Sequence, residues 1–171
     1  AISDYRGTHS AGPNFMYELA ARKVSDADRD RLDLSCWRMA LTAAEPVRAE
    51  TLQRFTERFS PVGFKSTTFS AGYGLSECTC KVAAVAWWRP TRILHLDAQE
   101  LENHRVVPVE AGRPVVGCGF PGQGMKGVIV DPVRRVPTDG AGEIWVSGPS
   151  VAEGYYANPE ATSTQLRATL D

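Results

Sequence analysis

The stretch TTFSAGYGLSE, residues Thr67–Glu77, decides how this sequence is interpreted. Residues 67–70 are a short strand candidate, Gly72-Tyr73-Gly74 has the composition of a tight turn, and a helix is predicted from Leu75 towards Trp87. In open α/β sheets, a turn from a strand into a helix lies where ligands bind, at the carboxyl end of the strand. The stretch therefore marks a candidate binding site.

The residue types in this turn favour an anion. Backbone N–H groups at Leu75, Ser76 and Glu77 would face it, helped by the dipole of the predicted helix, and Ser76 adds a hydroxyl donor. The ring of Tyr73 could stack on a base. A carboxylate at position 77 fits an anion site if a divalent cation lies between the two charges. A plain glycine turn, with Glu77 complementing the helix dipole, remains open as an alternative.

Helix and strand patterns alternate through the rest of the first half. Helices are predicted over residues 13–23 and 48–59, with a short helix capped by Ser25 and ending near Leu32. An apolar strand is predicted over residues 36–41. In the first helix Phe15, Met16, Leu19, Ala20 and Lys23 recur at helical spacing, which predicts an amphipathic helix. This order predicts an α/β fold, a partly parallel sheet with flanking helices.

The second half has the pattern of a hairpin or a small β-barrel. Strands are predicted over residues 92–96, 128–131 and 143–147, a helical turn over 98–103, and a final helix from Pro159. Gly117, Gly119, Gly122, Gly124 and Gly127 match a dinucleotide-binding spacing twice, but a strand rather than a helix follows them, so we interpret them as a connection.

Composition excludes several classes of function. The 171 residues include 19 Lys and Arg and 20 Asp and Glu, a formal charge of −1, which gives no long-range attraction for nucleic acid. We expect no membrane span, no signal peptide and a cytoplasmic location. Four cysteines are too few for a disulfide scaffold, so we expect reduced thiols. The three histidines form no ligand cluster with them, so we expect no metal site of this kind.

Four segments, in order, resemble motifs of one family. Thr8–Tyr17 is similar to T-H-S-x-x-P-N-F-x-Y, Thr42–Arg48 to N-G-A-E-P-V-R, Tyr73–Thr79 to Y-G-L-(A/S/T)-E-x-T, and Gly142–Tyr156 to G-E-I-W-V-x-G-P-S-V-A-x-G-Y-(W/Y). The chain therefore resembles the fatty acyl-AMP ligases, a branch of the adenylate-forming enzymes. Residues from about 92 to 119 resemble the extra segment that separates this branch from acyl-CoA ligases.

The resemblance implies a reaction and its participants. Family members join a fatty acid to ATP with the help of magnesium, giving acyl-AMP and pyrophosphate, and pass the acyl group to an acyl carrier protein or carrier domain in lipid, polyketide or lipopeptide biosynthesis. Matched positions imply catalytic roles for Ser76, at the α-phosphate, and for Glu77, at the metal. The nucleotide would contact Ala43, Ala44, Glu45, Tyr73, Gly74 and Leu75, and the acyl chain would lie near His9, Gly12, Pro13 and Asn14.

The chain departs from the family pattern in two ways. Thr42 and Ala43 stand where Asn and Gly are usual, and the added methyl group could narrow the adenine slot. The phosphate loop, the T-G-D motif and the C-terminal domain of the family are also absent from the 171 residues. We therefore expect a middle fragment that is inactive alone: an α/β subdomain (1–90), an insertion (91–116) and part of a β-barrel (117–171).

Two alternatives remain at this point. The first is a fragment of an acyl-CoA ligase or an amino-acid adenylation domain, which the insertion-like segment argues against. The second is a non-catalytic remnant that docks a partner protein.

Overall fold

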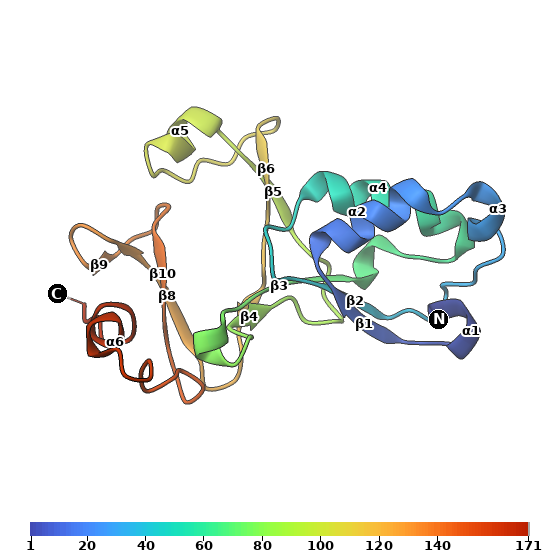
Figure 1. Cartoon of the computed structure of the whole chain (residues 1–171). Helices are drawn as coiled ribbons and strands as arrows, with labels where there is room; N and C mark the ends of the chain where they lie inside the picture. Colours follow the sequence, from blue (N-terminus) through green and yellow to red (C-terminus); the bar gives the residue numbers. More distant parts are fainter. Residues whose placement is uncertain (171) are drawn as a thin grey trace. The chain divides into compact units, whose positions relative to one another are not determined.

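A computed structural model describes residues 1–170 (Figure 1). The chain divides into two compact units, each built from three segments. The first unit comprises Ala1–Tyr73, Ala83–Leu94 and Pro114–Phe120; the second comprises Gly74–Val82, His95–Arg113 and the described chain from Pro121 onward. The domain boundaries expected near residues 90 and 116 stay a prediction.

The first unit is built on a sheet that is parallel on one side only. Strands β1 (His9–Gly12), β2 (Met39–Thr42) and β3 (Phe69–Tyr73) pair in parallel, and β4 (Ala83–Ala84) pairs antiparallel to β3. The sheet order is β1-β2-β3-β4-β7, with β7 at Phe120–Pro121. The α/β class with a partly parallel sheet is therefore confirmed.

Two long helices pack side by side on this sheet (Figure 1). They are α2 (Asn14–Lys23) and α4 (Ala49–Phe59), as the sequence predicted. Shorter helices are α1 (Ile2–Tyr5) and α3 (Asp26–Arg29), with 3-10 turns η1 (Ser60–Val62) and η2 (Ser66–Thr68). After η1, Gly63 adopts φ +94°, a left-handed conformation that glycine enters without steric cost, so the helical path ends there.

The core of the first unit is a cluster of aromatic rings. Phe55 of α4 lies at its centre, with ring centroids 4.5 Å from Phe59, 4.9 Å from Phe64 and 5.3 Å from Tyr17. Phe69 of β3 is 5.6 Å from Phe55, mostly edge-on, an arrangement that aromatic pairs prefer. These rings are at most 3% exposed and join the helices to the sheet.

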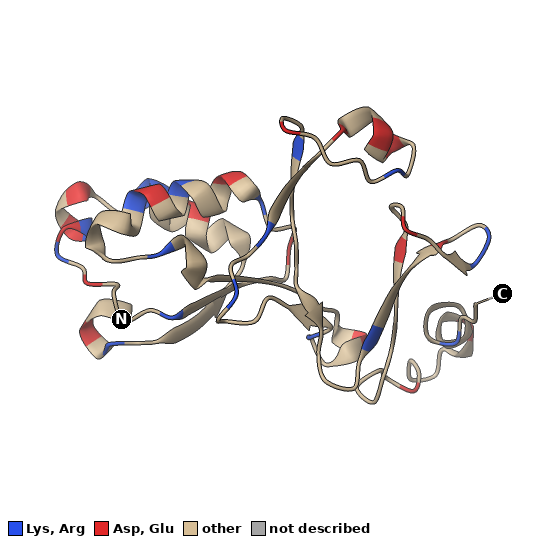
Figure 2. Ribbon diagram, turned by 180° about the vertical axis from the view of Figure 1, so that it is seen from behind, with Lys and Arg blue, Asp and Glu red and all other residues tan. Residues whose placement is uncertain are grey.

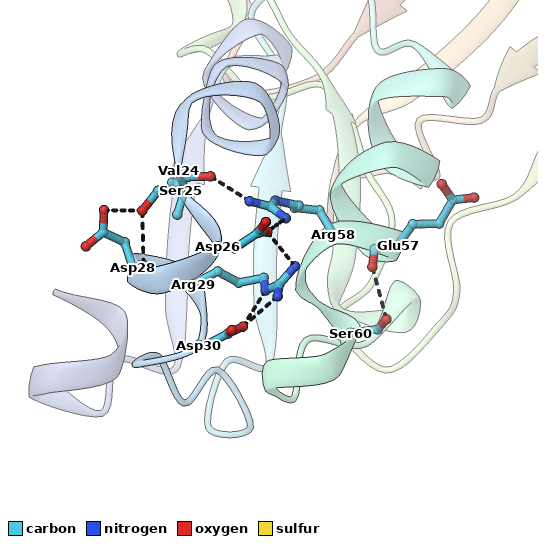
Figure 3. A network of polar contacts seen from close by, with 9 residues as sticks. All are labelled: Val24, Ser25, Asp26, Asp28, Arg29, Asp30, Glu57, Arg58 and Ser60. Atoms are coloured by element: carbon cyan, nitrogen blue, oxygen red, sulfur yellow. Dashed lines mark hydrogen bonds and ion pairs between the residues drawn. The ribbon is translucent and has the colours of Figure 1, made fainter.

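Charged side chains tie α3 to α4 at the surface of the same unit (Figure 3). Arg58 pairs with Asp26 and donates to the carbonyl of Val24 at 2.7 Å, while Arg29 lies 3.1 Å from Asp26. The Ser25 hydroxyl accepts the Asp28 N–H at 3.1 Å, so the predicted helix cap is present. Figure 2 shows Lys and Arg residues interspersed with Asp and Glu residues along these helices.

Two sequence predictions in the first unit are wrong in part. On α2, Phe15 is 60% exposed and Leu19 is 49% exposed, whereas Tyr17 is buried. The Tyr17 hydroxyl donates to the Leu41 carbonyl at 3.0 Å, so this residue, with a ring and a donor, takes the core position. The strand predicted from Cys36 begins at Met39, because Trp37 instead packs its ring into the aromatic cluster.

The predicted helix from Leu75 to Trp87 does not form. Gly72 and Tyr73 belong to β3 rather than to a turn, Thr67 lies in η2, and only a 3-10 turn, η3 (Ser76–Cys78), follows. Thr79 and Cys80 adopt φ +50° and +63°, which ends η3 and reverses the chain into β4. Sheet pairing therefore prevails over the local helical pattern.

The second unit consists of short elements. Its main sheet has the order β10-β8-β9, with β8 (Lys126–Asp131) antiparallel to both β10 (Glu143–Ser147) and β9 (Val136–Pro137). The helices are α5 (Ala98–Glu102) and α6 (Pro159–Leu166). Strands β5 (Ile93–Leu96) and β6 (Arg113–Val116) pair with each other, and the division between the units falls within both.

No helix within residues 1–170 combines the length and the apolar character that crossing a membrane requires.

Candidate functional site

In the first unit the carboxyl ends of β1 and β2 lie level with each other, and β3 extends two residues further. In the sheet register Gly12 of β1 pairs with Thr42 of β2, and Thr42 pairs with Ala71 of β3. The residues that follow Gly12 and Thr42 therefore leave the sheet at one edge, the edge at which α/β sheets bind ligands, and β3 continues beside them to Tyr73. A Cβ on Gly72 would lie 3.7 Å from the Ala43 Cβ, so these two positions are neighbours.

The loop after β2 is held in an uncommon conformation. Ala44 has φ +70°, which costs free energy for a residue with a Cβ and is often found at functional sites. Next to it, Oε1 of Glu45 accepts the N–H of Phe15 at 2.6 Å. The hydrogen bond joins the loop to the first turn of α2, so the predicted positions 43–45 form one braced segment with the start of that helix.

Asn14 is a brace rather than an open binding group. It is 5% exposed, its Oδ1 accepts the Arg48 N–H at 3.0 Å, and its Nδ2 donates to the Thr51 hydroxyl at 3.2 Å. Both ends of the amide therefore join α2 to the start of α4. His9 lies at the amino end of β1, away from Gly12 and Pro13, with Nδ1 2.9 Å from the Thr8 hydroxyl.

Thr42, one of the departures from the family pattern, is fully buried. Its hydroxyl finds no hydrogen-bond partner anywhere in residues 1–170. A buried hydroxyl without a partner costs free energy, and the structure offers no compensating contact for it.

In the second unit, the turn after Gly74 closes tightly on itself. The N–H groups of Cys78 and Cys80 both donate to the Leu75 carbonyl at 3.0 Å. A Cβ on Gly74 would lie 2.1 Å from the Cys80 carbonyl oxygen, so only glycine allows this approach. The turn replaces the predicted helix, and a three-residue 3-10 turn supplies little dipole; any anion would rely on local N–H and hydroxyl groups at Ser76 and Glu77.

The side chain of Glu77 has a defined partner within the second unit. Its Oε1 accepts the Tyr155 hydroxyl at 2.6 Å, and its backbone carbonyl accepts the Ala152 N–H at 2.7 Å. Hydrogen bonding from Tyr155 stabilises the carboxylate and lowers the pKa of Glu77, and the same bond raises the pKa of Tyr155. Glu77 is therefore ionised at neutral pH, and residue 155 is a site residue that the sequence patterns did not single out.

The Glu77 carboxylate fits a magnesium ion that would also be bound by the phosphates of a nucleotide. No cluster of three or more His, Cys, Asp or Glu side chains able to hold a metal occurs in the described chain. Magnesium does not need such a cage, because it keeps several waters and binds through one or two carboxylates plus substrate phosphates. Glu77 supplies one carboxylate, and its second oxygen, Oε2, accepts no hydrogen bond from another residue within 1–170.

Comparisons with known proteins show the family to which the chain belongs. The model of the AMP-binding enzyme family matches residues 1–156. The medium-chain-fatty-acid–[acyl-carrier-protein] ligases JamA of Moorena producens and TtuA of Teredinibacter turnerae are 44% and 38% identical, each over 99% of this chain. A fatty acyl-adenylate ligase from L. pneumophila, solved in complex with acyl adenylate and pyrophosphate, superposes with a TM-score of 0.88 at 35% identity over 95% of this chain.

The chain spans 30% and 27% of the two relatives and 29% of the solved structure. The family match nevertheless covers most of the 171 residues and includes the segments from Gly12 to Tyr155 described above. The chain belongs to the family of AMP-binding enzymes.

Proposed function

We propose that the protein activates a fatty acid with ATP, forming acyl-AMP and pyrophosphate, and passes the acyl group to an acyl carrier protein or carrier domain. The observation that carries this proposal is the ionised carboxylate of Glu77, in a segment that also presents Ser76. Tyr155 holds its Oε1, and no other residue within 1–170 donates a hydrogen bond to its Oε2. The names of the ligases similar to this chain support the same chemistry.

In this reaction two residues of the second unit, Ser76 and Glu77, would contact the α-phosphate and the magnesium. Ser76 is exposed and would donate its hydroxyl to the α-phosphate, and Glu77 would hold magnesium through Oε2. When bound by Glu77, magnesium would supply positive charge that offsets the charge of the phosphates and of the pyrophosphate leaving group. The acid's carboxylate oxygen forms a bond to the α-phosphorus as the bond to pyrophosphate breaks. The protein stabilises the developing charge, and no side-chain nucleophile is needed.

The residues of the first unit would bind the base. We propose that the Tyr73 ring stacks on adenine and that backbone groups at Ala43, Ala44 and Glu45 contact it. Gly74 and Leu75, which belong to the second unit, are proposed as further nucleotide-binding residues. The placement of Ala43 beside Gly72 and the bracing of Glu45 against Phe15 support a preformed surface there. Hydrogen bonds from a fixed backbone select a base without cost for ordering the loop.

Gly12 and Pro13 are proposed to lie near the acyl chain, because they leave the sheet at the same edge. Asn14 would act by holding α2 in place through Arg48 and Thr51. The proposal that His9 lies near the acyl chain rests on its sequence motif alone. ATP and the carrier protein are cytoplasmic reactants, so we place the activity in the cytoplasm.

The test is fatty-acid-dependent exchange of pyrophosphate into ATP, measured on the protein at the length its gene encodes. We expect exchange in the wild type and a loss of about 100-fold in Glu77→Gln, because a group that stabilises transition-state charge is removed. Tyr156→Phe is the matched control. Its ring is fully exposed. Residues 1–171 alone are expected to show no exchange.

Product analysis separates this function from its alternatives. Acyl-AMP and acylated carrier protein are the expected products. Acyl-CoA as the main product would show a CoA ligase, and binding of a partner protein without nucleotide affinity would show a docking module.

A further inference from the structure

Tyr155 reaches Glu77 from 78 residues away in the sequence. Its hydroxyl donates to Oε1 at 2.6 Å, a short hydrogen bond of the kind that charged acceptors form. No other side chain of the described residues donates to this carboxylate. Tyr155 therefore fixes the direction of a side chain that would otherwise sample several rotamers in solvent.

The backbone around Tyr155 is itself anchored. The Tyr155 N–H donates to the Thr162 hydroxyl at 2.8 Å, and that hydroxyl donates to the Asn158 carbonyl at 2.8 Å. Thr162 is 7% exposed and lies close against Gly154, where a Cβ would come within 3.0 Å of its Cγ2. The start of α6 therefore holds the tyrosine in place.

A second tether acts on the backbone of the same glutamate. The Ala152 N–H donates to the Glu77 carbonyl at 2.7 Å. Residues 152–162 thus hold Glu77 at two points, one on its main chain and one on its side chain, and both contacts lie within the second unit.

We infer that Tyr155 is a positioning residue for the Glu77 carboxylate, directing Oε2 towards a divalent cation bound with a nucleotide phosphate. The inference rests on the proposed function. A carboxylate has two oxygens with about four acceptor positions, so donation to Oε1 leaves Oε2 available to the cation. Partners that orient a metal-binding carboxylate in this way typically contribute 10–100-fold to metal affinity or activity.

The neighbouring Tyr156 provides a matched comparison. It has the same ring and hydroxyl, but its side chain is fully exposed and has no hydrogen-bond partner among the described residues. Phenylalanine at either position removes one hydroxyl and keeps the ring, so only the contact with Glu77 differs between the two variants.

The experiment measures ATP binding by calorimetry over a series of magnesium concentrations, on the protein as its gene encodes it. For Tyr155→Phe we expect the magnesium concentration that gives half of the full gain in ATP affinity to rise about 10-fold or more. Tyr156→Phe should leave it unchanged. ATP affinity without magnesium should be the same in both variants, which separates loss of metal positioning from general damage.

The outcomes distinguish the two proposals. If Glu77→Gln abolishes the gain from magnesium while Tyr155→Phe leaves the half-saturating concentration unchanged, the inference about Tyr155 is overturned and the proposed function stands. If Glu77→Gln keeps the full gain, the proposed metal role fails first.

Thr162 offers an independent route if Tyr155→Phe proves unstable. Thr162→Val removes the acceptor of the Tyr155 N–H and should raise the magnesium requirement, and Thr162→Ser should preserve it. An equal magnesium requirement in the two Thr162 variants would contradict the positioning of Glu77 through this segment.

Discussion

The two units are stabilised in different ways. In the first, large rings from two helices and a strand share one core around Phe55. In the second, the buried apolar side chains are small or isolated: Cys78, Val82, Leu96 and Val130. Its segments are instead held by hydrogen bonds such as those at Leu75, Glu77 and Thr162.

The two units therefore differ in the expected stability of their backbone and in the part of the nucleotide that each is proposed to bind. The residues proposed to bind adenine lie at the ends of strands that pack against the aromatic core. The backbone of these strands is therefore expected to be the most stable part of the chain. The residues proposed to bind phosphate and metal lie on a short turn with few apolar contacts. Segments of that kind open locally at low free-energy cost, and functional loops are commonly drawn from them.

The largest expected effect tests the core of the first unit. Phe55→Ala removes the ring at the centre of the aromatic cluster and should lower the free energy of unfolding by about 3–5 kcal/mol. Phe120→Ala, at a position that is 72% exposed, should change it by less than about 0.5 kcal/mol. Denaturant unfolding measures both values, and hydrogen exchange should show the slowest amides in α2, α4 and β3.

Slower exchange in the second unit than in these elements would reverse the comparison. So would a Phe55→Ala protein as stable as the Phe120→Ala control.

The next effect concerns alkaline pH. Burial raises the pKa of Tyr17 to about 12. The unfolded chain loses this proton near pH 10, so the folded state holds it over a wider range, and the stability present below pH 10 is lost as the pH rises towards 12. A Tyr17 pKa raised from 10 to about 12 corresponds to about 3 kcal/mol of stability that is lost over this pH range.

Tyr17→Phe should remove this loss between pH 10 and 12. It should also cost about 1 kcal/mol at neutral pH through the lost hydrogen bond to Leu41. Tyr5→Phe, at a site that is 84% exposed, is the control. Unfolding curves at several pH values check the prediction, and an identical alkaline loss in Tyr17→Phe would show that another group is responsible.

A smaller effect on stability is expected in the second unit. Gly74→Ala places a Cβ against the Cys80 carbonyl and should cost about 1–3 kcal/mol locally. Gly122→Ala adds a Cβ with only an ordinary contact, 3.9 Å from the Val82 carbonyl oxygen. We expect hydrogen exchange to accelerate in residues 74–81 of Gly74→Ala alone, with the exchange of α2 and α4 unchanged. Spread of the acceleration into those helices would break the distinction between the units.

Much of the first unit could be predicted from residue patterns. The spacing over Ala49–Phe59 and the cap at Ser25 are local features, and both appear in the structure. Burial on α2 could not be predicted in the same way, because Phe15 and Leu19 form as good an apolar stripe as the face that carries Tyr17. The choice depends on rings supplied by Trp37, Phe55 and Phe69, which come from distant positions.

The site was predicted as residue types rather than as geometry. The local pattern predicted a helix from Leu75, but the structure has a 3-10 turn there. The turn forms because β3 pairs with β4 and because Thr79 and Cys80 adopt left-handed conformations. The motif that includes Tyr155 and Tyr156 did not show which of the two tyrosines meets Glu77. Only the folded backbone from Ala152 to Thr162 separates them.

The proposed role of Glu77 is to bind a cation together with a nucleotide phosphate. Its most direct test is calorimetric titration of ATP, with and without magnesium, into the wild type and Glu77→Gln. We predict that magnesium tightens ATP binding at least about 10-fold in the wild type and has no effect in the variant, with equal metal-free affinities. Equal gains from magnesium in the two proteins would contradict the claim.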